Sequence, residues 1–271
     1  NDASEIANEL GNLSPSLASS ALGVTVTKTM PPRVTAFVFD APSPPPPPAL
    51  PFCPTYKQIC VDAGLSQAYT DCDSETAAMG TGTAGDTAGD SLGCRAYHLS
   101  VAATTNPGVH CLHASPDGGR TCVTRLTLAS DVEAMWAVIG SQRAHITVEY
   151  QGNGWLGFGV GTGRMVGSKV VIGDASGASK YSLTGLVKPS PDATQDFVGA
   201  TFTQADGVST LTYAAPLSWL EQFAPAPEGQ VTFTWARGSQ DALAYHGSTK
   251  GSKTVLTIRP PRGVASPSPP M

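Results

Sequence analysis

The stretch GWLGFGVGTGRMVGSKVVIGD, residues 154–174, holds two short apolar runs separated by glycine-bearing turn residues. Short runs that are rich in β-branched and aromatic residues and bounded by glycine predict strands. Met165 lies in the turn, just before the second run, KVVIGD. A methionine most often fills a gap in a core. Its place beside the start of a strand also allows a second interpretation, in which its thioether is one of a pair of metal ligands.

Similar runs recur between residues 123 and 258, with turn signals such as QGNG, QADG and ASGAS between them. Seven or more short strands with regular turns predict an antiparallel β-sandwich. The runs are AHITVEYQ, WLGFGVG, KVVIGDA, YSLTGLV, VGATFTQADG, VSTLTYAAP, QVTFTWARG and KTVLTI. The stretch PLSWLEQF is expected to form a brief helix or a crossover between strands.

The cysteines occupy one segment before these runs. An even number of cysteines in a short segment predicts disulfides formed in an oxidising compartment. Their spacings contain no Cys-x2-Cys, which favours disulfides over a zinc site. Six cysteines allow 15 pairings, and the sequence does not choose among them. The six are Cys53, Cys60, Cys72, Cys94, Cys111 and Cys122.

The cysteine-containing segment, residues 52–122, is predicted to be a small module of helices and loops stapled by three disulfides, because a core of this size needs such support. We expect helices at YKQICVDAGL, DSETAAMG and CRAYHLSVAA, the last with Tyr97, Leu99 and Val101 partly inward. The glycine-rich stretch 80–93 reads as a loop. In it, Asp86 and Asp90 partly match a calcium loop, but the EF-hand pattern is absent.

Three histidines fall within this module. His110 and His113 flank Cys111 in HCLH and could face a metal ion. The alternative, which the oxidation of Cys111 favours, is that both are ordinary, partly buried groups. His98 is expected to be structural, and His145, in AHITVEY, to be structural or exposed.

The remaining segments are rich in proline or in short strand-like runs. Residues 1–42 are predicted to form an arm or the end of a preceding unit, and Asn12-Leu-Ser within them is an acceptor sequence for N-glycosylation, although a proline follows it. SPPPPPALP, residues 43–51, predicts a stiff polyproline II linker. Such SPPPP runs resemble the hydroxyproline-rich glycoproteins of plant and green-algal cell walls. Residues 261–271 form a Pro/Ser-rich tail.

Composition excludes several classes of function. The net charge is −5, only 14% of residues are charged, and no basic patch suits nucleic acid. No run of 18 apolar residues predicts a transmembrane helix. The sequence holds no GxSxG, HExxH or Walker loop, and GFGVGTG precedes no predicted helix, so an enzyme acting by itself is not indicated. We expect a mature secreted protein or a part of a longer one.

The stretches MWAVIGSQRAHITVEYQGNGWLGFGVGTGRMVGSKVVIGD and FTWARGSQDALAYHGSTKGSKTVLTI resemble the DOMON domain, over roughly residues 126–258. This resemblance implies an immunoglobulin-like sandwich over residues 123–260 that binds haem b or a sugar. In haem-binding members the axial ligands are a Met in the M-V-G-S-like segment and a His before the last strand. These positions correspond to Met165 and His246.

A methionine and a histidine together are a suitable pair of ligands for a haem iron. A thioether and an imidazole close both axial positions of a haem iron, which then carries electrons. Gly163, Gly167 and Gly247 flank the two ligands and leave room for the porphyrin. The absence of CxxCH excludes covalent c-type attachment. The expected apolar walls are Trp155, Phe158, Val171 and Trp235.

The resemblance thus implies an extracellular haem b domain for one-electron transfer, with a redox partner that the sequence does not name. The alternative is a non-catalytic structural or adhesive glycoprotein module of a cell wall, extracellular matrix or surface appendage. Such a module would associate with itself, with matrix glycoproteins or with carbohydrate. A sugar-binding sandwich would use an exposed aromatic platform, for which Trp155, Asn153 and Tyr181 are the candidates.

Overall fold

The computed structural model describes residues 51–140, 142–222, 230–255 and 258. The chain divides into two compact units, Asn1–Ala49 and Leu50–Met271, and every described residue belongs to the second. The predicted arm over residues 1–42, nearly all of the proline-rich linker, the sequon at Asn12 and the tail over 261–271 lie outside the described residues.

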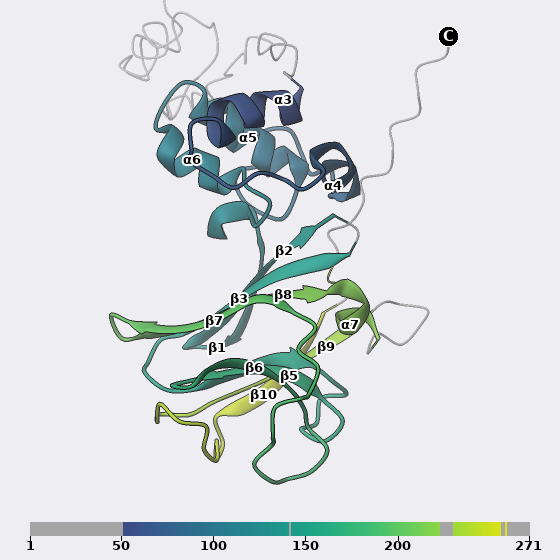
Figure 1. The fold of residues 1–271 in the computed structure, drawn as a ribbon, viewed down its shortest axis with the longest axis vertical. Helices are drawn as coiled ribbons and strands as arrows, with labels where there is room; N and C mark the ends of the chain where they lie inside the picture. Colours follow the sequence, from purple (N-terminus) through teal and green to yellow (C-terminus); the bar gives the residue numbers. More distant parts are fainter. Residues whose placement is uncertain (1–50, 141, 223–229, 256–257, 259–271) are drawn as a thin grey trace, which may run out of the picture. The chain divides into compact units, whose positions relative to one another are not determined.

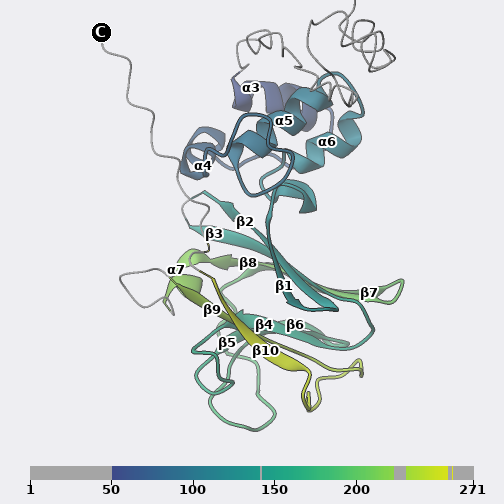
Figure 2. The same cartoon turned by 180° about the vertical axis from the view of Figure 1, so that it is seen from behind.

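Two five-stranded antiparallel sheets face each other in the described part of the chain (Figures 1 and 2). Across the first sheet the order is β1 (Thr124–Ala129), β2 (Val132–Ile139), β3 (Arg143–Tyr150), β8 (Val208–Pro216) and β7 (Val198–Ala205). Across the second it is β10 (Lys250–Val255), β9 (Val231–Arg237), β4 (Leu156–Val160), β5 (Lys169–Asp174) and β6 (Gly177–Ser182). The expectation of a mainly β, sandwich-like fold is confirmed.

Alternation along the strands builds the core between the sheets. Phe158 on β4 pairs in register with Val171 on β5 and with Trp235 on β9, so these three side chains share one face of the second sheet. That face points inward, where the Phe158 ring stacks on Phe233 at 5.0 Å between centroids. The prediction that Phe158, Val171 and Trp235 form the walls of a ligand pocket is therefore wrong, because they fill the core.

Some element boundaries differ from the prediction. The run YSLTGLV is a strand only to Ser182, and β6 begins earlier, at Gly177. Strands β1 and β2 were not among the predicted runs. PLSWLEQF does form a brief helix, α7 (Leu217–Glu221), whose three apolar side chains are buried. No helix in the described ranges has both the length and the apolar character needed to cross a membrane.

Short helices occupy the cysteine-containing segment. Two of the α-helices begin with a side-chain cap, in which Asp71 accepts a hydrogen bond from the backbone N–H of Ser74 and Ser91 accepts one from that of Cys94. The elements are α3 (Phe52–Tyr56), a π-helical turn (Lys57–Val61), α4 (Cys72–Ala78), α5 (Leu92–Ala102), α6 (Pro107–His113) and a 3-10 turn (Gly118–Arg120). The predicted disulfides are confirmed, and their pairing is Cys53–Cys72, Cys60–Cys111 and Cys94–Cys122.

Helix α5 confirms part of its predicted inward face, because Leu99 is buried and Val101 is partly buried, but Tyr97 does not belong to that face. Tyr97 is 36% exposed, whereas His98 is 5% exposed and Arg95 is fully buried. The prediction used every second residue, which is the spacing of a strand, while the inward face of a helix recurs every three or four residues.

A buried ion pair connects the helical segment to the first sheet. Asp90 Oδ1 accepts a hydrogen bond from Arg95 Nη1 at 2.9 Å, and Asp90 Oδ2 accepts one from the backbone N–H of Val138 in β2 at 2.8 Å. The other donors of Arg95 reach backbone carbonyls, including those of Ser115 and Pro116. Asp90 is thus a structural acceptor, which corrects its reading as a calcium ligand.

Candidate functional site

A second apolar cluster lies on the outer face of the second sheet. In β5, Val170 and Ile172 point to the side opposite Val171 and so leave the core between the sheets. We call this group the outer-face cluster. Its buried members are Trp155, Val170, Ile172, Tyr181 and Leu183, and Met165, Ala236 and Leu243 pack against it partly buried.

Met165 reaches this cluster from the loop between β4 and β5. The backbone N–H of Ser168 donates to the carbonyl of Met165 at 3.1 Å, which closes a turn. The N–H of Gly167 donates to the carbonyl of Leu183 at 2.7 Å and ties the loop to the end of β6. Gly163 and Gly167 have φ values of 82° and 89°, a conformation that residues with a Cβ rarely adopt. The glycines flanking Met165 thus serve the turn that presents its side chain.

His246 reaches the same cluster from the loop between β9 and β10. Its ring centroid lies 6.5 Å from that of Trp155, and the Tyr245 ring stacks on it at 5.1 Å. Nδ1 lies 3.0 Å from the carbonyl oxygen of Gly247. Because a carbonyl only accepts, Nδ1 carries a proton and donates this bond, and in the neutral ring Nε2 then bears the lone pair. The ring is therefore oriented, with the nitrogen that suits a metal ion left as an acceptor.

The loop that carries His246 is anchored to the outer-face cluster. The backbone N–H of Trp155 donates to the carbonyl of Gln240 at 2.9 Å, and the N–H of Leu243 donates to Asp174 Oδ2 at 3.1 Å. Burial alone would raise the pKa of Asp174, but hydrogen bonds from Ser176 and Leu243 outweigh it and lower that pKa. An ionised Asp174 therefore fixes the loop at neutral pH.

The side chains around Trp155 include the kinds of atoms that a haem group requires: ligands for the iron and a hydrogen-bond donor. Trp155 is 2% exposed, and its indole Nε1 is buried without a hydrogen-bond partner in the described part of the chain. Buried polar groups nearly always have a hydrogen-bond partner, so a bound ligand could supply the acceptor for this indole N–H. Met165 and His246 offer a soft thioether and an imidazole. Large exposed apolar side chains adjoin both, namely Val166 at 45% and Tyr245 at 85%.

The exposed aromatic platform expected of a sugar site is absent at the predicted positions. Trp155 and Tyr181 are 2% and 8% exposed. Neither ring face is therefore open to stack on a pyranose, and the prediction that they form such a platform is wrong.

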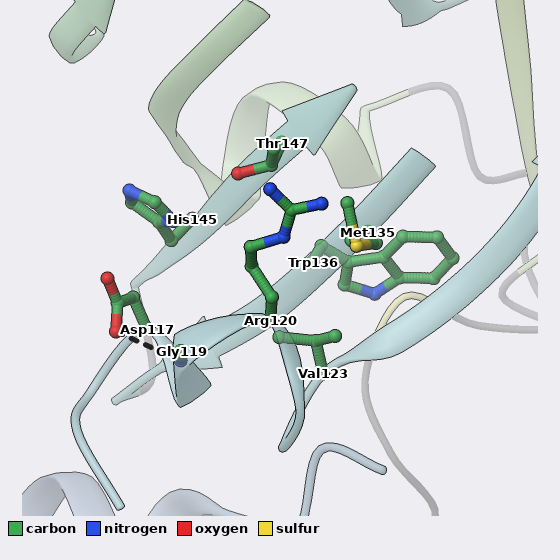
Figure 3. Close-up of a pocket in the computed structure, with 8 residues that line it drawn as sticks. All are labelled: Asp117, Gly119, Arg120, Val123, Met135, Trp136, His145 and Thr147. Atoms are coloured by element: carbon green, nitrogen blue, oxygen red, sulfur yellow. Dashed lines mark hydrogen bonds between the residues drawn. The ribbon is translucent and has the colours of Figure 1, made fainter. Parts of the chain in front are cut away.

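A small cavity of about 50 Å³ lies on the first sheet, away from Met165 and His246 (Figure 3). It has room for roughly one or two water molecules, which is too little for a haem. Burial lowers the pKa of His145, one of the lining residues, although Asp117 opposes this. The lining residues are Asp117, Gly119, Arg120, Val123, Met135, Trp136, His145 and Thr147.

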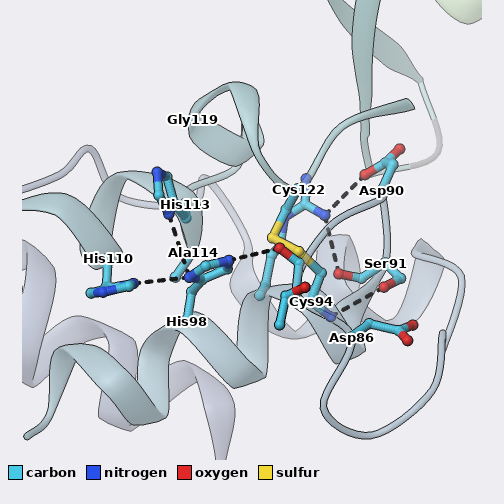
Figure 4. The surroundings of a disulfide bond; sticks show 12 residues. Asp86, Asp90, Ser91, Cys94, His98, His110, His113, Ala114, Gly119 and Cys122 are labelled. Atoms are coloured by element: carbon cyan, nitrogen blue, oxygen red, sulfur yellow. Dashed lines mark hydrogen bonds and ion pairs between the residues drawn. A yellow bond between two sulfur atoms is a disulfide. The ribbon is translucent and has the colours of Figure 1, made fainter. Parts of the chain in front are cut away.

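The structure also brings His98, His110 and His113 together on α5 and α6 (Figure 4). The sequence pattern HCLH indicates the last two. The contribution of His98 was missed, because it depends on the packing of α5 against α6.

Comparisons with known proteins are limited to parts of the chain. A family model described as the BfoA family C-terminal domain matches residues 49–125, less than half of the chain. No curated protein matches the sequence significantly. Among solved structures, the cytochrome b domain of pyranose dehydrogenase from Coprinopsis cinerea aligns with a TM-score of 0.36 and 15% identity, over 49% of this chain and 80% of that one.

The cytochrome domain of Myriococcum thermophilum cellobiose dehydrogenase aligns similarly, with a TM-score of 0.36 and 16% identity, over 54% of this chain and 85% of that one. Scores this low establish neither a common function nor a shared cofactor. The chain is thus similar to the BfoA C-terminal domain over residues 49–125, and it resembles the two cytochrome domains only distantly.

Proposed function

We propose that this chain is an extracellular haem b-binding domain for one-electron transfer, with Met165 and His246 as the axial ligands. One observation carries the proposal. Met165 and His246 lie far apart in the sequence and on different loops, yet Met165 packs on the outer-face cluster and His246 lies against Trp155 of that cluster. The same two residues are those to which the DOMON resemblance assigns ligation.

A haem bound by a thioether and an imidazole supplies one-electron transfer without an open iron position. The chain's own residues supply the rest. The hydrogen bond from His246 Nδ1 to the Gly247 carbonyl orients the imidazole, so that Nε2 would be the atom that holds the iron. Asp174 and the Trp155 backbone hold the His246 loop against the sheet. The apolar side chains of the outer-face cluster would exclude water from one side of the haem, and such burial is one means by which a protein sets the reduction potential.

Three disulfides in the helical segment are typical of a protein that folds in an oxidising compartment. This supports a location outside the cytosol, and we include a cell-surface or cell-wall location in the proposal. We assign the site electron transfer to a separate redox partner, because a haem iron held by a thioether and an imidazole would have both axial positions closed.

The test is the visible spectrum of the full chain, as purified and after addition of haem, oxidised and then reduced with dithionite. We expect a Soret band and the sharp α and β bands of a six-coordinate, low-spin haem in the reduced state. Met165→Leu and His246→Gln should each abolish the low-spin spectrum.

Met135→Leu and His145→Gln are the matched controls, because both residues lie on the first sheet and should leave the spectrum unchanged. A wild-type protein that shows no low-spin haem bands after addition of haem and removal of the unbound haem would refute the proposal. So would a low-spin spectrum that survives in both ligand variants.

A further inference from the structure

We propose that His98, His110 and His113 form a second, separate site that binds a divalent transition-metal ion, Zn²⁺ or Cu²⁺, through their three Nδ1 atoms. The site lies in the disulfide-stapled helices and does not depend on the haem proposal. Figure 4 shows the three rings turned toward one another.

The distances between the nitrogens suit a single ion. His98 Nδ1 lies 2.9 Å from His110 Nδ1 and 3.4 Å from His113 Nδ1. Zinc–imidazole bonds of 2.0–2.1 Å in tetrahedral geometry place neighbouring ligand atoms about 3.3 Å apart. The two observed separations lie on either side of this value. Imidazole ligands suit Zn²⁺ and Cu²⁺ in particular.

The hydrogen bonds of His98 leave the correct atom available. His98 Nε2 lies 3.1 Å from the carbonyl oxygen of Thr87, and because a carbonyl only accepts, Nε2 carries the proton. In a neutral ring Nδ1 then bears the lone pair. A backbone carbonyl that fixes the tautomer and orientation of a histidine in this way is typical of metal ligands in proteins.

Hydrogen bonds among the three histidines cannot give every Nδ1 atom of this cluster a partner. The single lone pair on His98 Nδ1 can accept one good N–H bond, and the shorter contact, with His110, would use it. His113 Nδ1 lies 3.4 Å from the same His98 Nδ1, which then has no lone pair left to accept a second hydrogen bond. One cation at the centre satisfies all three lone pairs at once.

Burial lowers the pKa of both His98 and His113, and the neighbouring rings lower it further, although the hydrogen bond to the Thr87 carbonyl opposes this at His98. A lowered pKa favours the neutral imidazole, which is the form that binds a metal ion.

The three ligands stand on a rigid frame. His110 and His113 are three residues apart on α6, which places them on one face of the helix. Cys111, between them, is bonded to Cys60, and Cys94, one turn before His98 on α5, is bonded to Cys122. Since both cysteines near His98 are oxidised, they offer no thiolate to the ion. His110 and His113 are half-buried, which gives the ion a path inward and leaves a fourth position for water or a ligand.

The test is titration of the chelator-treated full chain with Zn²⁺ and, separately, with Cu²⁺, followed by calorimetry. We expect saturable binding of one ion per chain and a rise in melting temperature with the ion. His110→Gln and His113→Gln should each weaken binding at least about 100-fold, because loss of a ligand exceeds the 10–100-fold cost of losing an outer partner. Both residues are half-buried, and the three disulfides should keep these variants folded, which circular dichroism checks.

His145→Gln is the control, since it removes a histidine on the first sheet, and it should bind one ion as the wild type does. Absence of saturable binding by the wild type would overturn the proposal and leave the cluster as a hydrogen-bonded structural group. Equal affinity in wild type, His110→Gln and His113→Gln would overturn it as well. Since the visible spectrum of haem and the calorimetric titration of a metal ion are independent readouts, either proposal can fail while the other stands.

Discussion

Replacing Asp90 with alanine should lower the free energy of unfolding by about 3–5 kcal/mol, the usual cost of breaking a buried ion pair from one side. The side chains of Asp90 and Arg95 are 1% and 0% exposed. Without the carboxylate, the guanidinium stays buried with only backbone carbonyls as partners, and the N–H of Val138 loses its acceptor.

Several features of the Asp90–Arg95 pair determine how much stability the Asp90→Ala variant should lose. An unsatisfied backbone N–H alone costs about 1–3 kcal/mol. Burial raises the pKa of Asp90 in spite of the adjacent guanidinium, so the desolvation cost borne by the pair is large. The hydrogen bonds from Arg95 to the Ser115 and Pro116 carbonyls limit the loss, because they continue to stabilise the guanidinium. The double variant Asp90→Ala/Arg95→Met should therefore lose less than the sum of the two single losses.

Urea unfolding followed by two signals measures the effect. All four tryptophans follow residue 122, so their fluorescence reports on the sandwich, whereas far-ultraviolet circular dichroism also reports on the helices. Asp90→Ala should shift both transitions, because Asp90 bonds to β2 as well as to α5.

The control is Asp62→Ala, which removes a surface ion pair whose side chains are 69% and 54% exposed and should change stability by less than about 1 kcal/mol. If Asp90→Ala costs no more than Asp62→Ala, the buried pair does not stabilise the fold in the way argued here.

Three further results are expected. Gly238→Ala should cost about 1–3 kcal/mol and weaken haem binding, since its Cβ would lie 2.1 Å from Trp155 Nε1; urea unfolding and haem titration measure both. Cys60→Ala/Cys111→Ala should cost about 4 kcal/mol for opening a loop of 51 residues, measured by urea unfolding. Burial lowers the pKa of His98, His113 and His145. When the folded state lowers the pKa of a histidine, the unfolded state takes up the proton first as the pH falls, so the metal-free protein should lose stability from pH 7 through 6.5 toward 5. The loss should be smaller in His113→Gln. Urea midpoints measured across this pH range test both statements.

The sequence predicts the sandwich well where strands alternate or are bounded by glycine, as in β4 and β5. It does not predict β2, VEAMWAVI, because that run is apolar at nearly every position and shows no alternation. The structure supplies the reason, since Met135 and Ala137 on its outer side pack in a small cluster with Val123. A strand covered on both faces loses the period of two by which strands are recognised.

The candidate haem site shows the same limit of sequence reasoning. Met165 and His246 were found through a family resemblance, and the structure brings both to the outer-face cluster. The pocket walls were chosen by residue type, and only Trp155 lies in that cluster. Which face of a strand a residue occupies depends on register, and a shift of one position exchanges core for surface. Val170 and Ile172, the neighbours of Val171, are the side chains that register places on the outer face.

The two proposed sites depend on different kinds of support within one chain. The haem site rests on loops held by backbone hydrogen bonds to a sheet without cysteines, so its geometry should survive reduction of the disulfides. The histidine site stands on short helices that could not hold a packed core alone. There the bond between Cys60 and Cys111 fixes the helix that carries two of the three ligands. This bond and the packing of α5 against α6 bring His98 to His110 and His113, an arrangement that no spacing in the sequence reveals.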